Sequence, residues 1–256
     1  MRPKHPVFDS NIDLNATIWR YFDYPKFTSM LLKQSLYFSR ANLLGDPLEG
    51  SFTRAREAER LALLEAPPEG QTREYLELAF KHNAETVKSL GFSHYINCWH
   101  LGDHESMAMW NLYSENSGVA IKTTVDVINN AVINQPFFDK TSFSHDSITY
   151  NNILSITSDL FTETHAEKNR LKLFYRKDIS FEHEKEYRFI LFDKKGAAQI
   201  PVRRVPLDNI TLNKFQIITH PLMPDWQFEN LKQICCGKIL LENFNKSTLT
   251  GSSSIL

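Results

Sequence analysis

The sequence has little cysteine and no excess of charge of either sign. Only three cysteines stand among 256 residues, and two of them, Cys235 and Cys236, are neighbours, which rarely bridge each other. We therefore expect no disulfide framework. We also expect the protein to reside in a reducing compartment, the cytoplasm. The 29 basic and 30 acidic residues give a formal charge of −1, which excludes the composition of a polybasic nucleic-acid binder.

Long apolar runs are also missing. No window reaches the roughly 18 consecutive apolar residues that cross a bilayer, and the first residues have no apolar signal segment. We therefore expect no membrane association. The glycine patterns of P-loop and dinucleotide-binding folds and the G-x-S-x-G of common hydrolases are absent as well, which argues against those chemistries.

Aromatic residues, in contrast, are plentiful at 12%, and 42% of the residues are hydrophobic, enough for a substantial core. Strand-like and helix-like segments alternate irregularly, without a repeat or a linker, which predicts one α+β domain with a mixed sheet. The predicted strands are 17–22, 36–39, 92–100, 118–124, 186–192 and 215–219. The predicted helices are 26–34, 152–172, 225–235 and one capped by Asp103 that carries Ser106, Met109, Trp110 and Tyr113 on one face.

The stretch 51–90 differs from the rest in composition. Charges of both signs are dense there, apolar residues recur at helical spacing, and a Pro-Pro-Glu-Gly at 67–70 divides it. This pattern predicts a helical insertion, a solvated hairpin of two amphipathic helices. We expect residues 1–15 to form a polar N-terminal arm and residues 250–256 a loose tail.

Two carboxylates stand two residues apart in Phe181-Glu-His-Glu-Lys-Glu-Tyr-Arg188. In a strand, Glu184 and Glu186 would project side by side, about 7 Å apart. Such a pair can hold the hydroxyls of a sugar and stabilise positive charge that develops at a sugar carbon. The alternative is a salt-bridge ladder with Arg188 on an exposed sheet face.

After the two carboxylates, the second candidate for a functional site is a cation among apolar neighbours. Arg20 shares a strand face with Ile18 and Phe22, and a buried guanidinium needs an anion. That anion is either a ligand phosphate or an internal carboxylate such as Asp46 or Glu49.

A run of histidines and one cysteine is the third. Cys98 and His100 share a strand face with His94, which superficially resembles a metal site, but no second cluster supports it and we expect no metal. Core or pocket-wall residues are the favoured interpretation, with Trp99 and Trp110 as flat surfaces on which a ring can stack.

The fourth candidate feature is a local excess of positive charge. Residues 167–204 contain 11 basic residues against 6 acidic ones, which suggests a surface for a phosphate-bearing ligand or a nucleic acid, unless these are solvated side chains. The basic residues are Lys168, Arg170, Lys172, Arg176, Lys177, Lys185, Arg188, Lys194, Lys195, Arg203 and Arg204.

Several short motifs follow one another along the chain. They are Trp19-Arg-Tyr21, Leu36-Tyr-Phe-Ser-Arg40, Asp46-Pro-Leu-Glu-Gly50, Cys98-Trp-His100, Glu105-Ser-Met-Ala-Met-Trp110 with Tyr113, Gly118-Val-Ala-Ile121, Phe181 to Arg188, His220-Pro221 and Lys246-Ser-Thr-Leu249. Taken together they resemble the bacterial domain-of-unknown-function family 2971, over about residues 17–249. That resemblance carries no activity.

A more distant resemblance concerns the order of a strand with an Arg, a short helix, a strand with a Ser, and a last strand that opens with Glu-x-Glu. This order is similar to the ADP-ribosyltransferase superfamily, which includes toxin-like enzymes that modify nucleic acid. The resemblance implies a split sheet and NAD as the substrate. The Ser-Thr-Ser triplet of the superfamily is absent, and Arg188 follows the second Glu closely.

Position by position, the resemblance implies a role for each matching residue. Arg20 would anchor the dinucleotide, and Ser39, with Tyr37 beside it, would support the ribose. Glu186 would be the catalytic carboxylate with Glu184 as its companion, and the choice between the two stays open. Tyr21 or Trp110 would supply an aromatic wall for nicotinamide.

The function expected from the residues and the resemblance is that of an NAD-dependent ADP-ribosyltransferase-like enzyme, a bacterial toxin or phage-defence effector that modifies a macromolecule, protein or nucleic acid. Two alternatives remain. One is a non-catalytic nucleotide-binding sensor module, and the other is a nucleic-acid-processing protein that uses the basic stretch 167–204.

Overall fold

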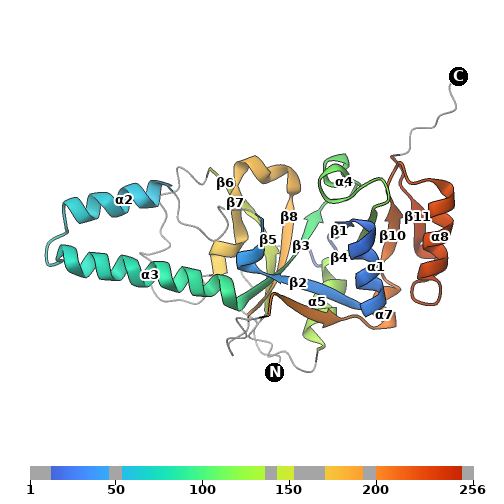
Figure 1. Ribbon diagram of the computed structural model, residues 1–256, viewed down its shortest axis with the longest axis horizontal. Coiled ribbons are helices and arrows are strands. Elements are labelled where there is room, and N and C mark those ends of the chain that lie inside the picture. The colour runs from blue at the N-terminus through green and yellow to red at the C-terminus, as the bar shows by residue number, and fades with distance from the viewer. Residues whose placement is uncertain (1–12, 46–53, 136–142, 153–170, 193–199, 250–256) are drawn as a thin grey trace, which may run out of the picture.

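A mixed sheet organises the computed structural model, which describes residues 13–45, 54–135, 143–152, 171–192 and 200–249 (Figure 1). Nine strands of the described chain join in it, with the order β11-β10-β4-β1-β3-β2-β9 and with β8 and β5 added at β3. Its strands are β1 (Thr17–Phe22), β2 (Ser35–Arg40), β3 (His94–Leu101), β4 (Val119–Thr124), β5 (Phe143–Ser147), β8 (Glu186–Phe192), β9 (Val202–Pro206), β10 (Gln216–Thr219) and β11 (Phe244–Lys246). Two short strands, β6 (Thr149–Asn151) and β7 (Arg176–Asp178), pair in parallel beside it.

The helices complete a single α+β domain, as the sequence predicts. They are α1 (Tyr24–Lys33), α2 (Arg54–Glu65), α3 (Arg73–Ser93), α4 (Met107–Tyr113), α5 (Val125–Ile133), α7 (Asn209–Leu212) and α8 (Asp225–Cys235). Short 3₁₀ segments are η1 (Ala41–Leu43), η3 (Lys172–Tyr175), η4 (Ile179–Glu184) and η5 (Leu241–Asn243). No helix of these described segments is long and apolar enough to cross a membrane.

One strand, β3, has an edge that two other strands share. Its opposite edge pairs with β8 along its length, from His94 opposite Phe192 to His100 opposite Glu186. On the shared edge, β2 pairs near the start of β3 and β1 pairs only at its end. The strands β1 and β2 therefore separate beside the middle of β3. There the buried Asn97 of β3 donates a side-chain hydrogen bond of 2.7 Å to the carbonyl of Tyr37 in β2.

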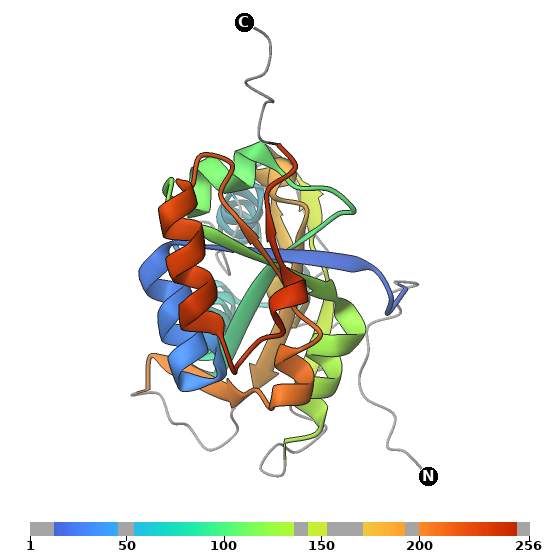
Figure 2. The same cartoon turned by 90° about the vertical axis from the view of Figure 1, so that its right-hand side faces the viewer.

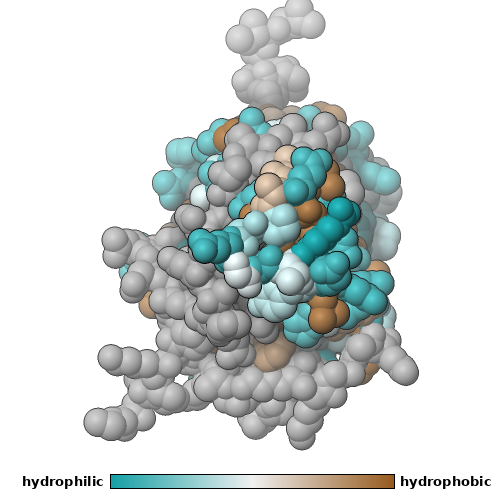
Figure 3. All heavy atoms as spheres, turned by 90° about the vertical axis from the view of Figure 1, so that its left-hand side faces the viewer, coloured by the Kyte–Doolittle hydropathy of each residue, from teal (hydrophilic) through white to brown (hydrophobic). Residues whose placement is uncertain are grey.

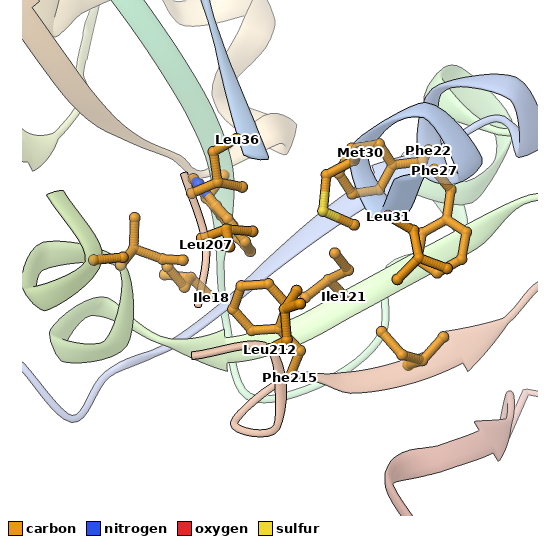
Figure 4. Close-up of a cluster of buried hydrophobic side chains, with 14 of the residues drawn as sticks. Ile18, Phe22, Phe27, Met30, Leu31, Leu36, Ile121, Leu207, Leu212 and Phe215 are labelled. Carbon is orange, nitrogen blue, oxygen red and sulfur yellow. The ribbon is translucent and has the colours of Figure 1, made fainter. Parts of the chain in front are cut away.

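The main core lies on one face of the sheet, under α1, α5, α7 and α8. Figure 2 shows α1 and α8 side by side over that face. Phe27, Met30 and Leu31 of α1 point toward the sheet, where Ile18 and Ile121 lie (Figure 4). Because side chains alternate along a strand, Tyr187, Phe189 and Leu191 of β8 join this core, while its other residues face the opposite side.

The predicted helical insertion is present as α2 and α3, which pack on each other and extend away from the sheet (Figure 1). Leu64 and Leu76 are buried, whereas Leu61, Tyr75 and Leu78 are exposed. Figure 3 views the molecule from this end and shows mostly hydrophilic side chains with a few hydrophobic ones on the described surface. The hairpin is therefore amphipathic and largely solvated.

Some predicted boundaries differ from the structure. The helix of Met109 and Trp110 is capped by Ser106 and not by Asp103, since the Ser106 hydroxyl accepts a 3.3 Å bond from the Met109 amide. The strand expected from Phe92 begins at His94, because α3 continues through Ser93. Most of the predicted arm (1–12), the tail (250–256) and most of the predicted helix 152–172 (153–170) lie outside the described residues.

Candidate functional site

A pocket with a volume of about 620 Å³ lies where β1 and β2 separate. That volume is typical of a site for a small molecule or cofactor. Side chains from β1, α1, β2, β3, α4 and the segment from β7 to β8 form its walls. Of the seven residues expected to bind NAD or act on it, six line the pocket, namely Arg20, Tyr21, Tyr37, Ser39, Glu184 and Glu186.

Trp110, the seventh of these residues, is not among the residues that line the pocket. It is fully buried behind Tyr21, with the two rings edge to face and 4.8 Å apart. Its indole N–H donates a 3.1 Å hydrogen bond to Glu105. The structure therefore places Trp110 in a small core cluster that supports the pocket wall. Trp99, also considered as a stacking surface, does line the pocket.

The Arg20 guanidinium stands out among the cations of the pocket. Lys26 pairs with Asp23 at 2.6 Å, Lys177 with Glu184 at 2.6 Å and Arg188 with Glu186 at 2.8 Å. Arg20, in contrast, forms no hydrogen bond or ion pair with any residue in the described part of the chain.

The contacts of Arg20 are aromatic. Its guanidinium carbon lies 5.1 Å from the centre of the Phe22 ring and 5.9 Å from that of Trp99. Burial lowers the pKa of Arg20 to about 10, although the neighbouring Cys98 acts in the opposite direction. Asp46 and Glu49, the internal partners considered for Arg20, lie outside the described residues.

Glu186 is the first residue of β8, and the side chain of Arg188 lies on the same strand face. The guanidinium donates two parallel bonds to the carboxylate, of 2.8 and 2.9 Å, and Lys177 adds its ammonium at 3.5 Å. The ion pair with Arg188 was one predicted alternative, but both side chains are buried in the pocket wall and not on an exposed face. Burial acts to raise the pKa of Glu186, yet Arg188 and Lys177 outweigh it and hold the pKa at about 2.

Glu184 reaches the same charges by a different backbone route from the predicted one. The prediction of one strand that contains both carboxylates is wrong, because Glu184 ends the 3₁₀ segment η4 and Lys185 adopts a left-handed φ of 41°. Both carboxylates nevertheless meet at the ammonium of Lys177. Tyr113 donates a 2.8 Å hydrogen bond to the other oxygen of Glu184. The pair is thus fixed by side-chain contacts and not by strand geometry.

Lys177, Tyr113, Cys98 and His100 also line the pocket, although they are not among the catalytic or NAD-binding residues expected from the sequence. Lys177 is buried between the two carboxylates, and Cys98 donates a hydrogen bond to Glu186. Desolvation alone would lower the pKa of Lys177, but Glu186 and Glu184 raise it, so this lysine is cationic. The placement of Cys98 and His100 in the same wall agrees with the pocket-wall interpretation of the histidine run. No group of three or more metal-binding side chains occurs in the described segments.

The basic stretch 167–204 does not form one surface. Lys177 and Arg188 are buried in the pocket wall, while Lys185 and Arg204 are exposed. Lys168, Arg170, Lys194 and Lys195 lie outside the described residues. At least two of the eleven cations therefore serve the internal network and are not available to a polyanion.

The arrangement combines three features that bind different parts of a ligand. Arg20 supplies a cation for an anion, the ionised Glu186 can accept hydrogen bonds from hydroxyls, and Tyr21, Phe22 and Trp99 supply apolar ring surfaces. Phosphate, sugar and base together make up a nucleotide. The pocket is therefore chemically suited to a nucleotide.

Comparison with models of protein families gives a match for part of the chain. Residues 109–189 match the model of a family described as a protein of unknown function, DUF2971. The match includes most of α4 and the charged wall from Lys177 to Arg188, and it leaves out β1 with Arg20. No curated protein and no solved structure matches the chain.

Proposed function

We propose that this protein is an ADP-ribosyltransferase-like enzyme that binds NAD in the pocket and transfers its ADP-ribosyl group to a macromolecule. The observation that carries the proposal is the position of Arg20, which has no anionic partner in the described chain, in one pocket with two carboxylates. A dinucleotide brings a pyrophosphate for the first and ribose hydroxyls for the second. The resemblance in order supports it as well, because Arg20 lies on β1, Ser39 on β2 and Glu186 at the start of β8.

The protonation states favour a substrate whose leaving group needs no proton. With a pKa of about 2, Glu186 is ionised at neutral pH and cannot act as a general acid. His100 is a poor acid too, since burial lowers its pKa. Most glycosides require an acid to protonate the departing oxygen. Nicotinamide does not, because its ring nitrogen is positively charged in NAD. This nitrogen takes the electron pair of the broken bond, and nicotinamide leaves as a neutral molecule without a proton.

The proposed step balances without an added reagent. The bond between ribose C1′ and the nicotinamide nitrogen breaks, and its electron pair leaves with nicotinamide. The carbon gains positive charge, which Glu184 and Glu186 stabilise through the ribose hydroxyls. As this bond breaks, an acceptor hydroxyl or amine bonds to C1′, and the acceptor's proton passes to the surrounding water.

Release of nicotinamide from NAD tests the proposal. We expect the wild-type protein to release nicotinamide and to label a macromolecule in a cell lysate with radioactive ADP-ribose. Glu186→Gln should lower both signals about 100-fold or more, because one charged stabilising group is removed from the transition state. Glu182→Gln is the matched control, since Glu182 is an exposed glutamate four residues before Glu186, in the 3₁₀ segment η4. Equal signals from all three proteins, or no signal from any, would contradict the proposal.

One observation favours a second candidate, a non-catalytic nucleotide-binding module. Both carboxylates are already held by cations, and the charge that they can offer to a sugar carbon is partly neutralised. This candidate predicts saturable NAD binding by calorimetry without nicotinamide release. The two measurements on one sample separate the candidates.

A further inference from the structure

His100 is the pocket residue whose hydrogen bonding leaves an atom ready for chemistry that the proposed step still lacks. It stands near the end of β3, opposite Glu186 of β8, and its ring lines the pocket. The ring is buried and lies edge-on to Tyr21, 6.3 Å between centres. Its position is therefore fixed on both sides.

The protonation of the ring follows from one contact. Nδ1 lies 2.6 Å from the backbone carbonyl of Glu184. A carbonyl oxygen only accepts hydrogen bonds, so Nδ1 carries the proton and donates it. In the neutral ring the lone pair is then on Nε2, the nitrogen that can take up a proton.

The second nitrogen is accessible. In the described part of the chain no residue donates a hydrogen bond to Nε2. Among the described side chains, the one polar atom that is inaccessible to solvent and has no hydrogen-bond partner is the hydroxyl oxygen of Ser35. Because Nε2 of His100 also has no partner there, it is accessible to solvent or to a ligand. Gly102 lies beside it, and a Cβ at that position would approach Nε2 to 3.4 Å.

We propose that His100 is the general base that removes the proton from the acceptor hydroxyl or amine as this group attacks C1′ of the bound NAD. The inference rests on the proposed function and adds the residue that activates the second substrate. As the acceptor oxygen or nitrogen bonds to C1′, its proton moves to Nε2, and the electron pair of the broken C–N bond leaves with nicotinamide. The imidazolium then returns the proton to water.

The charged groups around the ring are compatible with this role. Burial lowers the pKa of His100, the Glu184 carbonyl and carboxylate act to raise it, and Lys185 acts to lower it. The net direction is downward, so the imidazole is neutral at pH 7 and its Nε2 can accept a proton. Tyr21 from β1 packs on the ring, and its own pKa is raised to about 12 mainly by burial, so it is uncharged.

His100→Asn tests the role, because the Asn amide retains a donor near the Nδ1 position for the Glu184 carbonyl but has no base at Nε2. We expect it to release nicotinamide from NAD about 100-fold more slowly than wild type, with water as acceptor, in line with the usual contribution of a general base. Sodium azide, a nucleophile that carries no proton at pH 7, should restore the rate and form ADP-ribosyl azide. His104→Asn, an exposed histidine four residues away, is the control and should behave as wild type.

Each outcome is informative. A His100→Asn rate equal to wild type overturns the role of His100 and leaves the proposed function intact. A slow rate that azide does not restore means that His100 only holds the backbone of Glu184, which also overturns it. A wild-type protein that releases no nicotinamide, with or without azide, overturns the proposed function and the inference with it. His100→Gln and the thermal midpoints of all variants control for misfolding.

Discussion

Arg20 on β1 and Arg188 on β8 line the same pocket, but their guanidinium groups have opposite surroundings. Arg188 is 1% exposed and donates to both oxygens of Glu186 and to the carbonyl of Phe174. Arg20 contacts two aromatic rings and pairs with no carboxylate in the described chain. In the pocket wall formed by β8 (the β8 wall), ion pairs balance the charges of Glu186 and Arg188, whereas the wall formed by β1 (the β1 wall) has in Arg20 a cation with no anion among the described residues.

This difference indicates that Arg188 serves the stability of the fold and Arg20 the binding of a ligand. Removal of one partner from a buried, hydrogen-bonded ion pair destabilises the fold, because it leaves a buried charge without compensation. Burial of a charge without a partner costs desolvation free energy, which a bound anion can offset. We therefore infer that β8 preorganises the carboxylates and that β1 attracts the ligand.

The same substitution at both arginines tests the comparison most severely. Arg188→Met leaves Glu186 buried with only Lys177 and Cys98 as partners, and we expect the free energy of unfolding to fall by about 3–5 kcal/mol. Urea unfolding followed by circular dichroism measures it. A loss below about 1 kcal/mol would mean that Lys177 alone balances the carboxylate and that the β8 wall is not a closed network.

Low pH should remove the contribution of Glu186 in the β8 wall to the free energy of unfolding. The pKa of Glu186 is lowered from 4.5 to about 2 in the folded protein, so its contribution to stability is complete above about pH 4.5 and is lost as the pH falls toward 2. This difference corresponds to about 3 kcal/mol. The unfolding free energy of Glu186→Gln should therefore be lower than that of wild type at pH 7 and converge with it near pH 2. Parallel curves for the two proteins would refute the assignment, and Glu182→Gln should follow wild type throughout.

The parts of this network that were predicted from the sequence are those that follow a simple period. Residues 17–22 were predicted as a strand from their aromatic and β-branched side chains, and 186–192 was predicted as a strand too, with Glu186 and Arg188 on one face by alternation. The structure has both strands. A cation among apolar residues of a strand is rare enough to single out Arg20. These features depend only on neighbours in the sequence.

The parts that were missed depend on distant contacts or unusual backbone. Nothing in the sequence marks the left-handed Lys185, which is a lysine and not a glycine, and this residue removes Glu184 from the strand. Lys177 resembles the solvated lysines around it until the packing of β7 buries it beside two carboxylates. His100 is positioned by a carbonyl 84 residues away.

Trp110 illustrates a different difficulty. An apolar helix face predicts that its residues are buried, but the same face can line a pocket or fill a core. The structure places Trp110 behind Tyr21 because the Tyr21 hydroxyl accepts a 2.9 Å bond from the Ser106 amide at the start of α4. This contact fixes the helix against β1, and it joins residues 85 positions apart.

Arg20→Met completes the comparison with the smallest expected effect on folding. Methionine keeps an apolar stem against Phe22 and Trp99 and removes the charge, so the free energy of unfolding should equal or exceed that of wild type. The affinity for NAD should fall about 30-fold, or about 2 kcal/mol, because a charge-assisted contact to the pyrophosphate is lost. Calorimetric titration measures it, with inorganic pyrophosphate as a competitor that binds wild type only. If Arg20→Met instead destabilises the fold as much as Arg188→Met, Arg20 has a structural partner and β1 does not attract the ligand.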